Sequence, residues 1–181
     1  MTPRRRGAPR RRRETPVLDA PAARRAAFDL LARKAWTRLE LTRRIERRGA
    51  PEDVARAVVE DLGARGYLDD ESFARWWAEA RARSRQVGSV RLRQELLAKG
   101  VPRDLAAAAV DAAFEETAEV DRALAAGRRR LASLVAAGRD RAPARLGAYL
   151  LRRGYPASVV SRAVKTLTGE APADPFDDGA V

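Results

Sequence analysis

One segment recurs three times in this chain: a short helical pattern, a glycine, one further residue, a proline and a second amphipathic run. The copies read RIERRGAPEDVARAVVEDL from Arg44, QELLAKGVPRDLAAAAVDAAF from Gln94 and YLLRRGYPASVVSRAVKTL from Tyr149. Their glycines, Gly49, Gly100 and Gly154, are 51 and 54 residues apart. Self-similarity at such a period is typical of repeat proteins, so the sequence predicts one helical unit used three times in a modular array.

The glycine and proline of each copy predict a tight corner between two helices. Glycine after the last periodic apolar residue supplies a left-handed backbone conformation, and the proline two residues later suits the first turn of a new helix. Apolar residues stand eight and four positions before each glycine, at Leu41 and Ile45, Leu92 and Leu96, and Leu146 and Leu150. Each copy is therefore predicted to be a helix, a corner and a helix.

A third helix is predicted in front of each corner pair. These first helices start near Ala22, Asp70 and Thr117, the second helices span about 38–48, 89–99 and 141–153, and the third follow each proline. In the first of them, Ala27, Phe28, Leu31 and Ala35 have helical spacing and are predicted to face the core.

The predicted fold is all-α, with three tandem three-helix repeats forming an elongated, curved array. The repeats cover residues 17–66, 67–116 and 117–168. A unit of about fifty residues buries little surface alone, so neighbouring repeats are expected to share an interface. The Arg-rich residues 1–16 and the acidic residues 169–181 have few apolar side chains and are predicted to be disordered tails. An array with polar outer ends is expected to be a monomer.

Composition excludes several function classes. The chain contains no cysteine and no histidine, which removes disulfides, zinc fingers, thiol nucleophiles and histidine acid–base chemistry. No phosphate-binding glycine loop and no nucleophile with a nearby base is found, so the chain is predicted to be no enzyme and to need no cofactor. It has no apolar run of about 18 residues and no signal peptide, which predicts a soluble cytoplasmic protein without membrane contact.

Positive charge is the main candidate for partner binding. The formal net charge is +12, and the third repeat is its most basic part. Such a balance favours acidic or nucleic-acid partners. The candidate filament-binding or DNA-binding residues are Arg43, Arg44, Arg47, Arg81, Arg128, Arg129, Arg130, Arg152 and Arg153. Arginines at the ends of second helices could equally serve the helix dipole, whereas Arg128, Arg129 and Arg130 lie in mid-helix, where at least one must point away from the core.

Two further features have structural and functional interpretations. Trp77 follows Phe73 by four residues and is predicted to be core, which leaves Trp76 partly exposed, as a cover for a repeat junction or as a contact hot spot. Asp69 and Asp70 are predicted to cap the helix that contains Phe73. Two adjacent carboxylates without a third ligand are weak evidence for a metal.

Several segments resemble the RecX family of recombination regulators. They are GYLDDESFA from Gly66, GSVRLRQELLAKGV from Gly88 and the helix pair that includes LARKAWTRLELTRRI, and the similarity covers roughly residues 22–168. The resemblance implies three tandem three-helix repeats and a modulator of the RecA recombinase. Such a protein acts along the groove of the RecA filament on single-stranded DNA. In most members the outcome is reduced ATP hydrolysis, strand exchange and co-protease activity.

The residues alone leave other functions open. The trihelical units superficially resemble helix-turn-helix modules, so the chain could be a stand-alone DNA-binding protein that contacts single-stranded or duplex DNA directly. It could also be a helical scaffold for another partner. The sequence does not set the sign of regulation.

Overall fold

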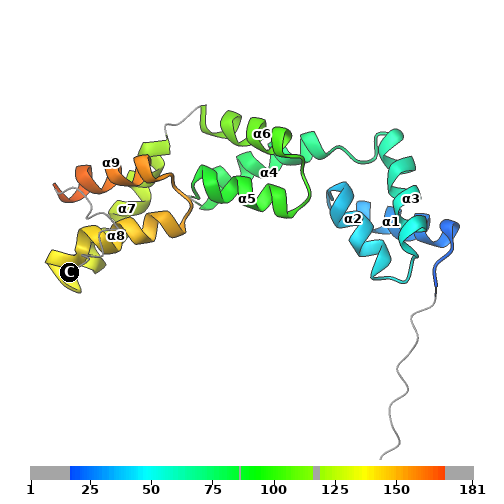
Figure 1. Cartoon of the computed structure of the whole chain (residues 1–181), viewed down its shortest axis with the longest axis horizontal. Helices are drawn as coiled ribbons and strands as arrows, with labels where there is room; N and C mark the ends of the chain where they lie inside the picture. The colour runs from blue at the N-terminus through cyan, green and yellow to red at the C-terminus, as the bar shows by residue number, and fades with distance from the viewer. Residues whose placement is uncertain (1–16, 86, 116–118, 170–181) are drawn as a thin grey trace, which may run out of the picture. The chain divides into compact units, whose positions relative to one another are not determined.

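The computed structural model describes residues 17–85, 87–115 and 119–169, and every regular element in these ranges is helical. The elements are α1 (Ala20–Leu31), α2 (Arg38–Glu46), α3 (Glu52–Ala64), α4 (Asp70–Arg85), α5 (Ser89–Ala98), α6 (Arg103–Glu115), α7 (Glu119–Ala136), the short 3₁₀-helix η1 (Arg139–Arg141), α8 (Ala142–Arg152) and α9 (Ala157–Thr168). The all-α prediction is confirmed for these ranges, and Figure 1 shows the order of the helices along the chain. The two predicted tails lie outside the described residues, apart from Gly169.

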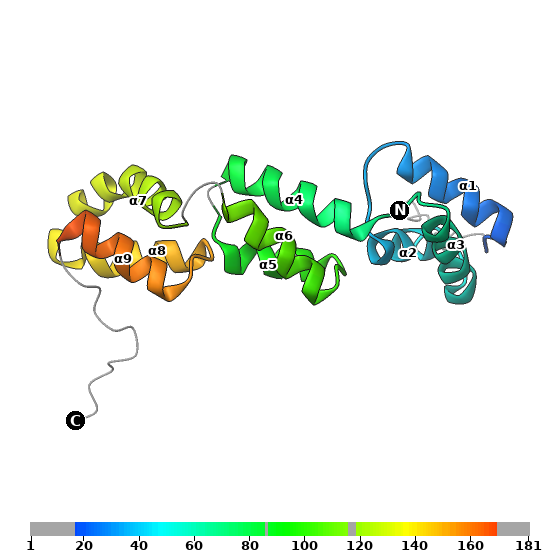
Figure 2. The ribbon, with the colours of Figure 1, turned by 90° about the horizontal axis from the view of Figure 1, so that it is seen from above.

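The chain divides into two compact units. One is formed within Met1–Lys34 and Leu41–Tyr67, and the other within Ala35–Glu40 and Leu68–Val181. The second unit therefore contains the second and third repeats together with the first residues of α2. In Figure 2, α4 to α6 and α7 to α9 can be followed as two bundles within this unit.

Each bundle encloses an apolar core of small and branched side chains. In the first, Ala23, Ala27 and Leu30 of α1 are buried together with apolar residues of α2 and α3. In the second, α4 packs mainly on α6, and in the third α7 packs on α8 and α9. Tyr155 is 2% exposed, and burial raises its pKa to about 12.

The core face predicted for the first helix is partly wrong. Phe28 is 40% exposed and packs edge-on against Tyr67, with 5.2 Å between the ring centroids. Ala35 is exposed and lies beyond the end of α1. Ala27 is buried as predicted, and the rest of the core face is Ala23, Ala26 and Leu30, because alanines carry much of the apolar face and shift its centre.

The predicted corners are confirmed. Gly49, Gly100 and Gly154 have φ values of 104°, 84° and 83°. In the third corner the Gly154 N–H donates to the Leu151 carbonyl at 2.8 Å and the Tyr155 N–H to the Leu150 carbonyl at 3.3 Å, and the other two corners repeat this pair. This is the Schellman arrangement, which satisfies the last carbonyls of the preceding helix. The prolines precede the first helical residue, one position earlier than predicted.

Each later corner also receives the start of the preceding repeat's second helix. The Gly88 N–H donates to the Arg153 carbonyl at 2.9 Å and the Val90 N–H to the Gly154 carbonyl at 3.1 Å. Counting back twelve residues from the corner glycine, Thr37 is the counterpart of Gly88. The buried Thr37 hydroxyl donates to the Lys99 carbonyl, the counterpart of the Arg153 carbonyl, at 2.6 Å. The same docking is therefore built twice within the second unit.

In the first repeat, the segment before α1 occupies the equivalent position on the corner. The Leu18 N–H donates to the Gly49 carbonyl at 2.9 Å, as the Val90 N–H does to the Gly154 carbonyl. Leu18 therefore covers the first corner through a single backbone hydrogen bond.

Replacing Leu18 with proline is expected to weaken the first repeat. The change removes the N–H that reaches Gly49 and should cost about 0.5 to 1.5 kcal/mol, or about a 2- to 12-fold rise in local opening. Hydrogen exchange of the α2 and α3 amides measures it. Val17→Pro is the matched control, because the Val17 N–H makes no backbone hydrogen bond within the described part of the chain. Equal exchange in the two variants would show that the bond contributes nothing.

Candidate interaction surface

The arginines at the end of α2 are mostly free to meet a partner. Arg43, Arg44 and Arg47 are exposed. The neighbouring Arg48 is half-buried, and its guanidinium donates to the Ala26 carbonyl at 3.2 Å. One arginine of this cluster therefore stabilises the first repeat, while the other three present charge to solvent.

Arg128, Arg129 and Arg130, here called the α7 patch, are successive cations that spread over nearly a whole turn of α7. All three are exposed, whereas Ala123, Ala126, Gly127 and Leu134 of the same helix are buried. Within the described residues none of the three arginines has an ion pair. The prediction that at least one of them points away from the core is confirmed, because all three are exposed.

The two arginines at the end of α8 differ from each other. Arg152 is exposed at the end of the helix. Arg153 is half-buried, and its guanidinium carbon lies 5.0 Å from the centre of the Tyr149 ring. Arg153 is held against the protein surface through this cation–π contact, so Arg152 is the more accessible of the two.

Arg81 lies in an internal ion pair. Its Nη2 is 2.8 Å from Oε2 of Glu95, and the two side chains are only 20% and 18% exposed. The guanidinium also lies over the Trp77 ring, 5.1 Å from its centroid. Although burial raises the pKa of Glu95, hydrogen bonds from Arg81 and Arg91 bring that pKa below its usual value. Arg81 therefore links α4 to α5 and does not belong to the exposed basic set.

Lys99 is the centre of a second internal cluster that the sequence did not indicate. Its Nζ lies 4.1 Å from the Trp77 ring centroid and 2.7 Å from Oε1 of Glu40. The side chains of the ion pair are 18% and 23% exposed. The cluster joins α5 and α4 to the start of α2, and only the long-range fold brings these residues together. Trp76 is 58% exposed, as predicted, whereas Trp77 is half-buried and packs against the edge of the second repeat's core, so it is not a fully buried core residue.

The acidic pair at the start of α4 has a structural role. Oδ1 of Asp69 accepts hydrogen bonds from the Glu71 and Ser72 N–H groups, both at 3.0 Å, as an N-cap does. Hydrogen bonds from Ser72 lower the pKa of Asp69, whereas burial raises the pKa of Asp70. Asp70 accepts the Arg38 N–H at 2.9 Å, so only Asp69 caps as predicted. In the described ranges no cluster of three or more acidic side chains could hold a metal.

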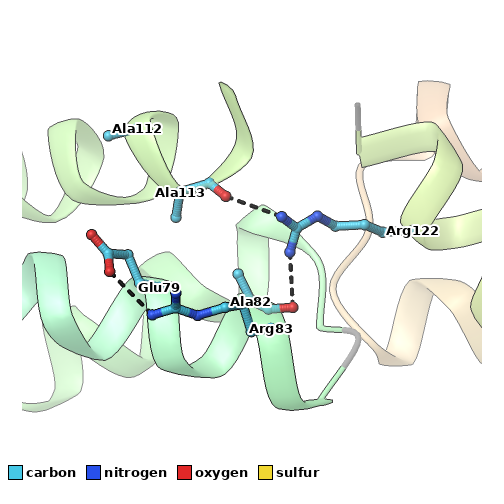
Figure 3. A pocket seen from close by; sticks show the side chains of 6 residues that line it. All are labelled: Glu79, Ala82, Arg83, Ala112, Ala113 and Arg122. Carbon is cyan, nitrogen blue, oxygen red and sulfur yellow. Dashed lines mark hydrogen bonds and ion pairs between the residues drawn. The ribbon is translucent and has the colours of Figure 1, made fainter. Parts of the chain in front are cut away.

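Arg122 of α7 ties the third repeat to the second. Figure 3 shows its guanidinium reaching between the ends of α4 and α6. It donates to the Ala82 carbonyl at 2.8 Å and to the Ala113 carbonyl at 3.3 Å. Both carbonyls belong to the last turns of their helices, where a cation also opposes the negative end of the helix dipole. No local sequence pattern distinguishes Arg122 from its neighbours.

A second contact fixes the same repeats on the side of α5. Oε1 and Oε2 of Glu119 accept the Ser89 N–H at 2.6 Å and the Ser89 hydroxyl at 3.1 Å. The carboxylate therefore caps the start of α5 from the third repeat. With Arg122 and the docked corner, the second and third repeats are joined by polar contacts at three places.

Comparison with known proteins identifies the family. Two family models match, the first three-helix domain of RecX over residues 23–62 and the second over residues 69–110. A regulatory protein RecX from Pseudomonas savastanoi pv. phaseolicola is 36% identical over 159 residues, which are 85% of this chain and 97% of that protein. The chain belongs to the RecX family. A regulatory protein RecX from Mycobacterium avium is 38% identical over 134 residues, covering 74% of this chain and 77% of that protein.

Solved structures of RecX proteins share the fold. The crystal structure of RecX from Lactobacillus salivarius matches with a TM-score of 0.72 at 14% identity and covers 83% of this chain and 97% of that one. Another crystal structure of a regulatory protein RecX gives a TM-score of 0.75 at 17% identity, covering 81% and 73%. The resemblance to the RecX family that the sequence indicated is thus confirmed. Membership of this family of regulatory proteins assigns the chain a regulatory role. None of its described helices is long and apolar enough to cross a membrane.

Proposed function

We propose that this protein binds the RecA recombinase filament on single-stranded DNA along its groove and inhibits its ATPase, strand-exchange and co-protease activities during recombination and DNA repair. Membership of a family of regulatory proteins carries the proposal. It acts as a monomer in the cytoplasm, without chemistry of its own. The partner surface of a nucleoprotein filament offers acidic groups and phosphates, and exposed arginines suit both.

The exposed arginines of the repeats supply the contacts. Arg43, Arg44 and Arg47 in the first repeat and Arg128, Arg129, Arg130 and Arg152 in the third are exposed. Arg81 and Arg153 contribute only indirectly, because each is held by a contact within the protein and is less accessible to a partner. Binding to repeating filament subunits would block their closure on ATP or their access to a second DNA.

Titrating the protein against a purified RecA recombinase tests the function. With filaments preassembled on single-stranded DNA, we expect ATP hydrolysis to fall at near-equal or lower ratios of protein to RecA. The second candidate function, stand-alone DNA binding, is favoured by the net charge of +12. Tight binding to bare DNA together with unchanged ATP hydrolysis would support that candidate and exclude filament regulation.

Replacing Arg128, Arg129 and Arg130 together with alanine should weaken inhibition about tenfold. Exposed charge contacts contribute about 0.2 to 1 kcal/mol each, and three near 0.5 kcal/mol give about one decade. The matched control is Arg56→Ala, Arg75→Ala and Arg83→Ala, which changes net charge equally but removes arginines already paired with acids on their own helices. Half-inhibitory concentrations measure the difference. If the two triple variants behaved alike, net charge and not the α7 patch would explain binding.

A further inference from the structure

The second and third repeats form a groove to which the proposed function above gives no role. It lies between α5 and the end of α8, is open to solvent and has a volume of about 370 Å³. Its lining residues are Val90, Arg91, Gln94, Glu95 and Ala98 from α5, and Leu151, Arg152 and Gly154 from the end of α8. Because the docked corner fixes α5 against Arg153 and Gly154, the two walls of the groove are held together by backbone hydrogen bonds.

Two exposed large apolar side chains, Val90 and Leu151, line this groove. Val90 is 39% exposed and Leu151 is 42% exposed. Leu97, which is 37% exposed, lies on the same helix as Val90. Leu97 and Leu151 each stand three residues before a corner glycine, so the same position of two successive repeats exposes a leucine. Exposed apolar groups gathered at one place mark an interaction site more often than scattered ones do.

The charge around the groove is positive. The side chain of Arg91 is 53% exposed, and Arg152 is exposed as well. The one acidic lining residue, Glu95, is compensated by Arg81 behind it at 2.8 Å and by Arg91 at 3.3 Å. An occupant with negative charge therefore meets two arginines at the rim without an opposing free carboxylate.

An apolar groove with a positively charged rim favours a protein segment over nucleic acid as the occupant. A DNA backbone gains nothing from burying Val90 and Leu151, and the groove lacks the aromatic side chains on which bases stack. An apolar anchor that enters between two aliphatic walls, with acidic neighbours on an arginine rim, matches both chemistries at once.

We propose that this groove is the docking site for an acidic protein segment that inserts an apolar side chain between Val90 and Leu151. The assignment rests on the proposed function, since the recombinase of the filament supplies that segment. Repeat-equivalent leucines suit a partner made of repeating subunits, because Leu97 and Leu151 can meet like surfaces. The α7 arginines then add charge contacts away from the apolar anchor.

Substitution of Leu151 tests the site. Leu151→Glu removes the anchor and adds a repelling charge, so the half-inhibitory concentration against RecA filaments should rise about tenfold or more, the effect of losing one hot-spot contact. Leu151→Lys removes the same anchor but keeps the positive rim. Its half-inhibitory concentration should therefore rise less than that of Leu151→Glu. Val135→Glu is the matched control, because Val135 is 39% exposed and also lies in the last turn of its helix, α7. It should stay within about twofold of the wild type.

The outcomes separate the groove from the function. Thermal unfolding of all three variants within the same range as the wild type verifies that the fold is intact. If wild-type protein inhibits the filament and Leu151→Glu inhibits equally well, the groove assignment is overturned and the proposed function stands. If Leu151→Lys weakens inhibition more than Leu151→Glu does, the docking segment is not acidic. Failure of the wild type to inhibit would instead remove the proposed function and, with it, this partner.

Discussion

Replacing Gly154 with alanine is expected to destabilise the second unit by about 2 to 5 kcal/mol. Gly154 has a φ of +83°, which costs a non-glycine residue about 1 to 2 kcal/mol. A Cβ at this position would also lie 2.6 Å from the nitrogen of Arg91 and 2.9 Å from its Cα. Those atoms are backbone, and overpacking of that kind costs about 1 to 3 kcal/mol more. Denaturant unfolding followed by fluorescence or circular dichroism measures the loss.

The control for this substitution separates conformation from close approach. Gly169 has a φ of +75°, and a Cβ added there would meet nothing within 4 Å. Gly169→Ala should therefore cost only the conformational part, about 1 to 2 kcal/mol. Similar losses for Gly169→Ala and Gly154→Ala would contradict the docking of α5 onto the corner. A clear excess for Gly154 would support it.

Replacing Arg122 with alanine is expected to cost about 2 kcal/mol. The guanidinium makes two hydrogen bonds to carbonyls of other helices, and bonds to charged groups contribute about 1.5 to 3 kcal/mol each. Its buried Nε has no partner within the described residues, so removing the side chain also relieves an unmet desolvation cost and lowers the net effect. Lysine at this position could not reach both carbonyls with one compact ammonium and should rescue little.

Arg129→Ala is the matched control for Arg122, since both arginines belong to α7 and Arg129 is exposed. Its unfolding free energy should stay within about 0.5 kcal/mol of the wild type. Hydrogen exchange should show faster opening at the ends of α4 and α6 only in Arg122→Ala. Unchanged exchange there would mean that Arg122 does not join the repeats.

Much of the fold follows from local sequence. Gly49, Gly100 and Gly154 each end a helix in the same way because a left-handed glycine with a proline two residues later allows few alternatives. The buried face of the first helix is harder to predict from the sequence, because alanine occurs in cores as readily as on surfaces. The sequence pattern therefore does not distinguish a buried face through Ala23, Ala27 and Leu30 from one that includes Phe28 and Ala35.

The candidate surface was less predictable than the fold. Exposure of Arg128, Arg129 and Arg130 follows from helix geometry, since three successive residues cannot all face a core. The pairing of Arg81 with Glu95 joins two helices, and the contacts of Arg122 join two repeats. Such contacts depend on the packing of segments, which residue spacing along one helix does not specify. The groove at Leu151 requires a neighbouring repeat and has no signature in either helix alone.

Electron cryo-microscopy of RecA filaments assembled on single-stranded DNA and mixed with this protein tests filament regulation most directly. We expect density for the helical repeats along the filament groove, with the α5–α8 groove facing a recombinase subunit and the α7 arginines close to acidic side chains or phosphates. Bare filaments beside protein bound only to naked DNA would contradict it.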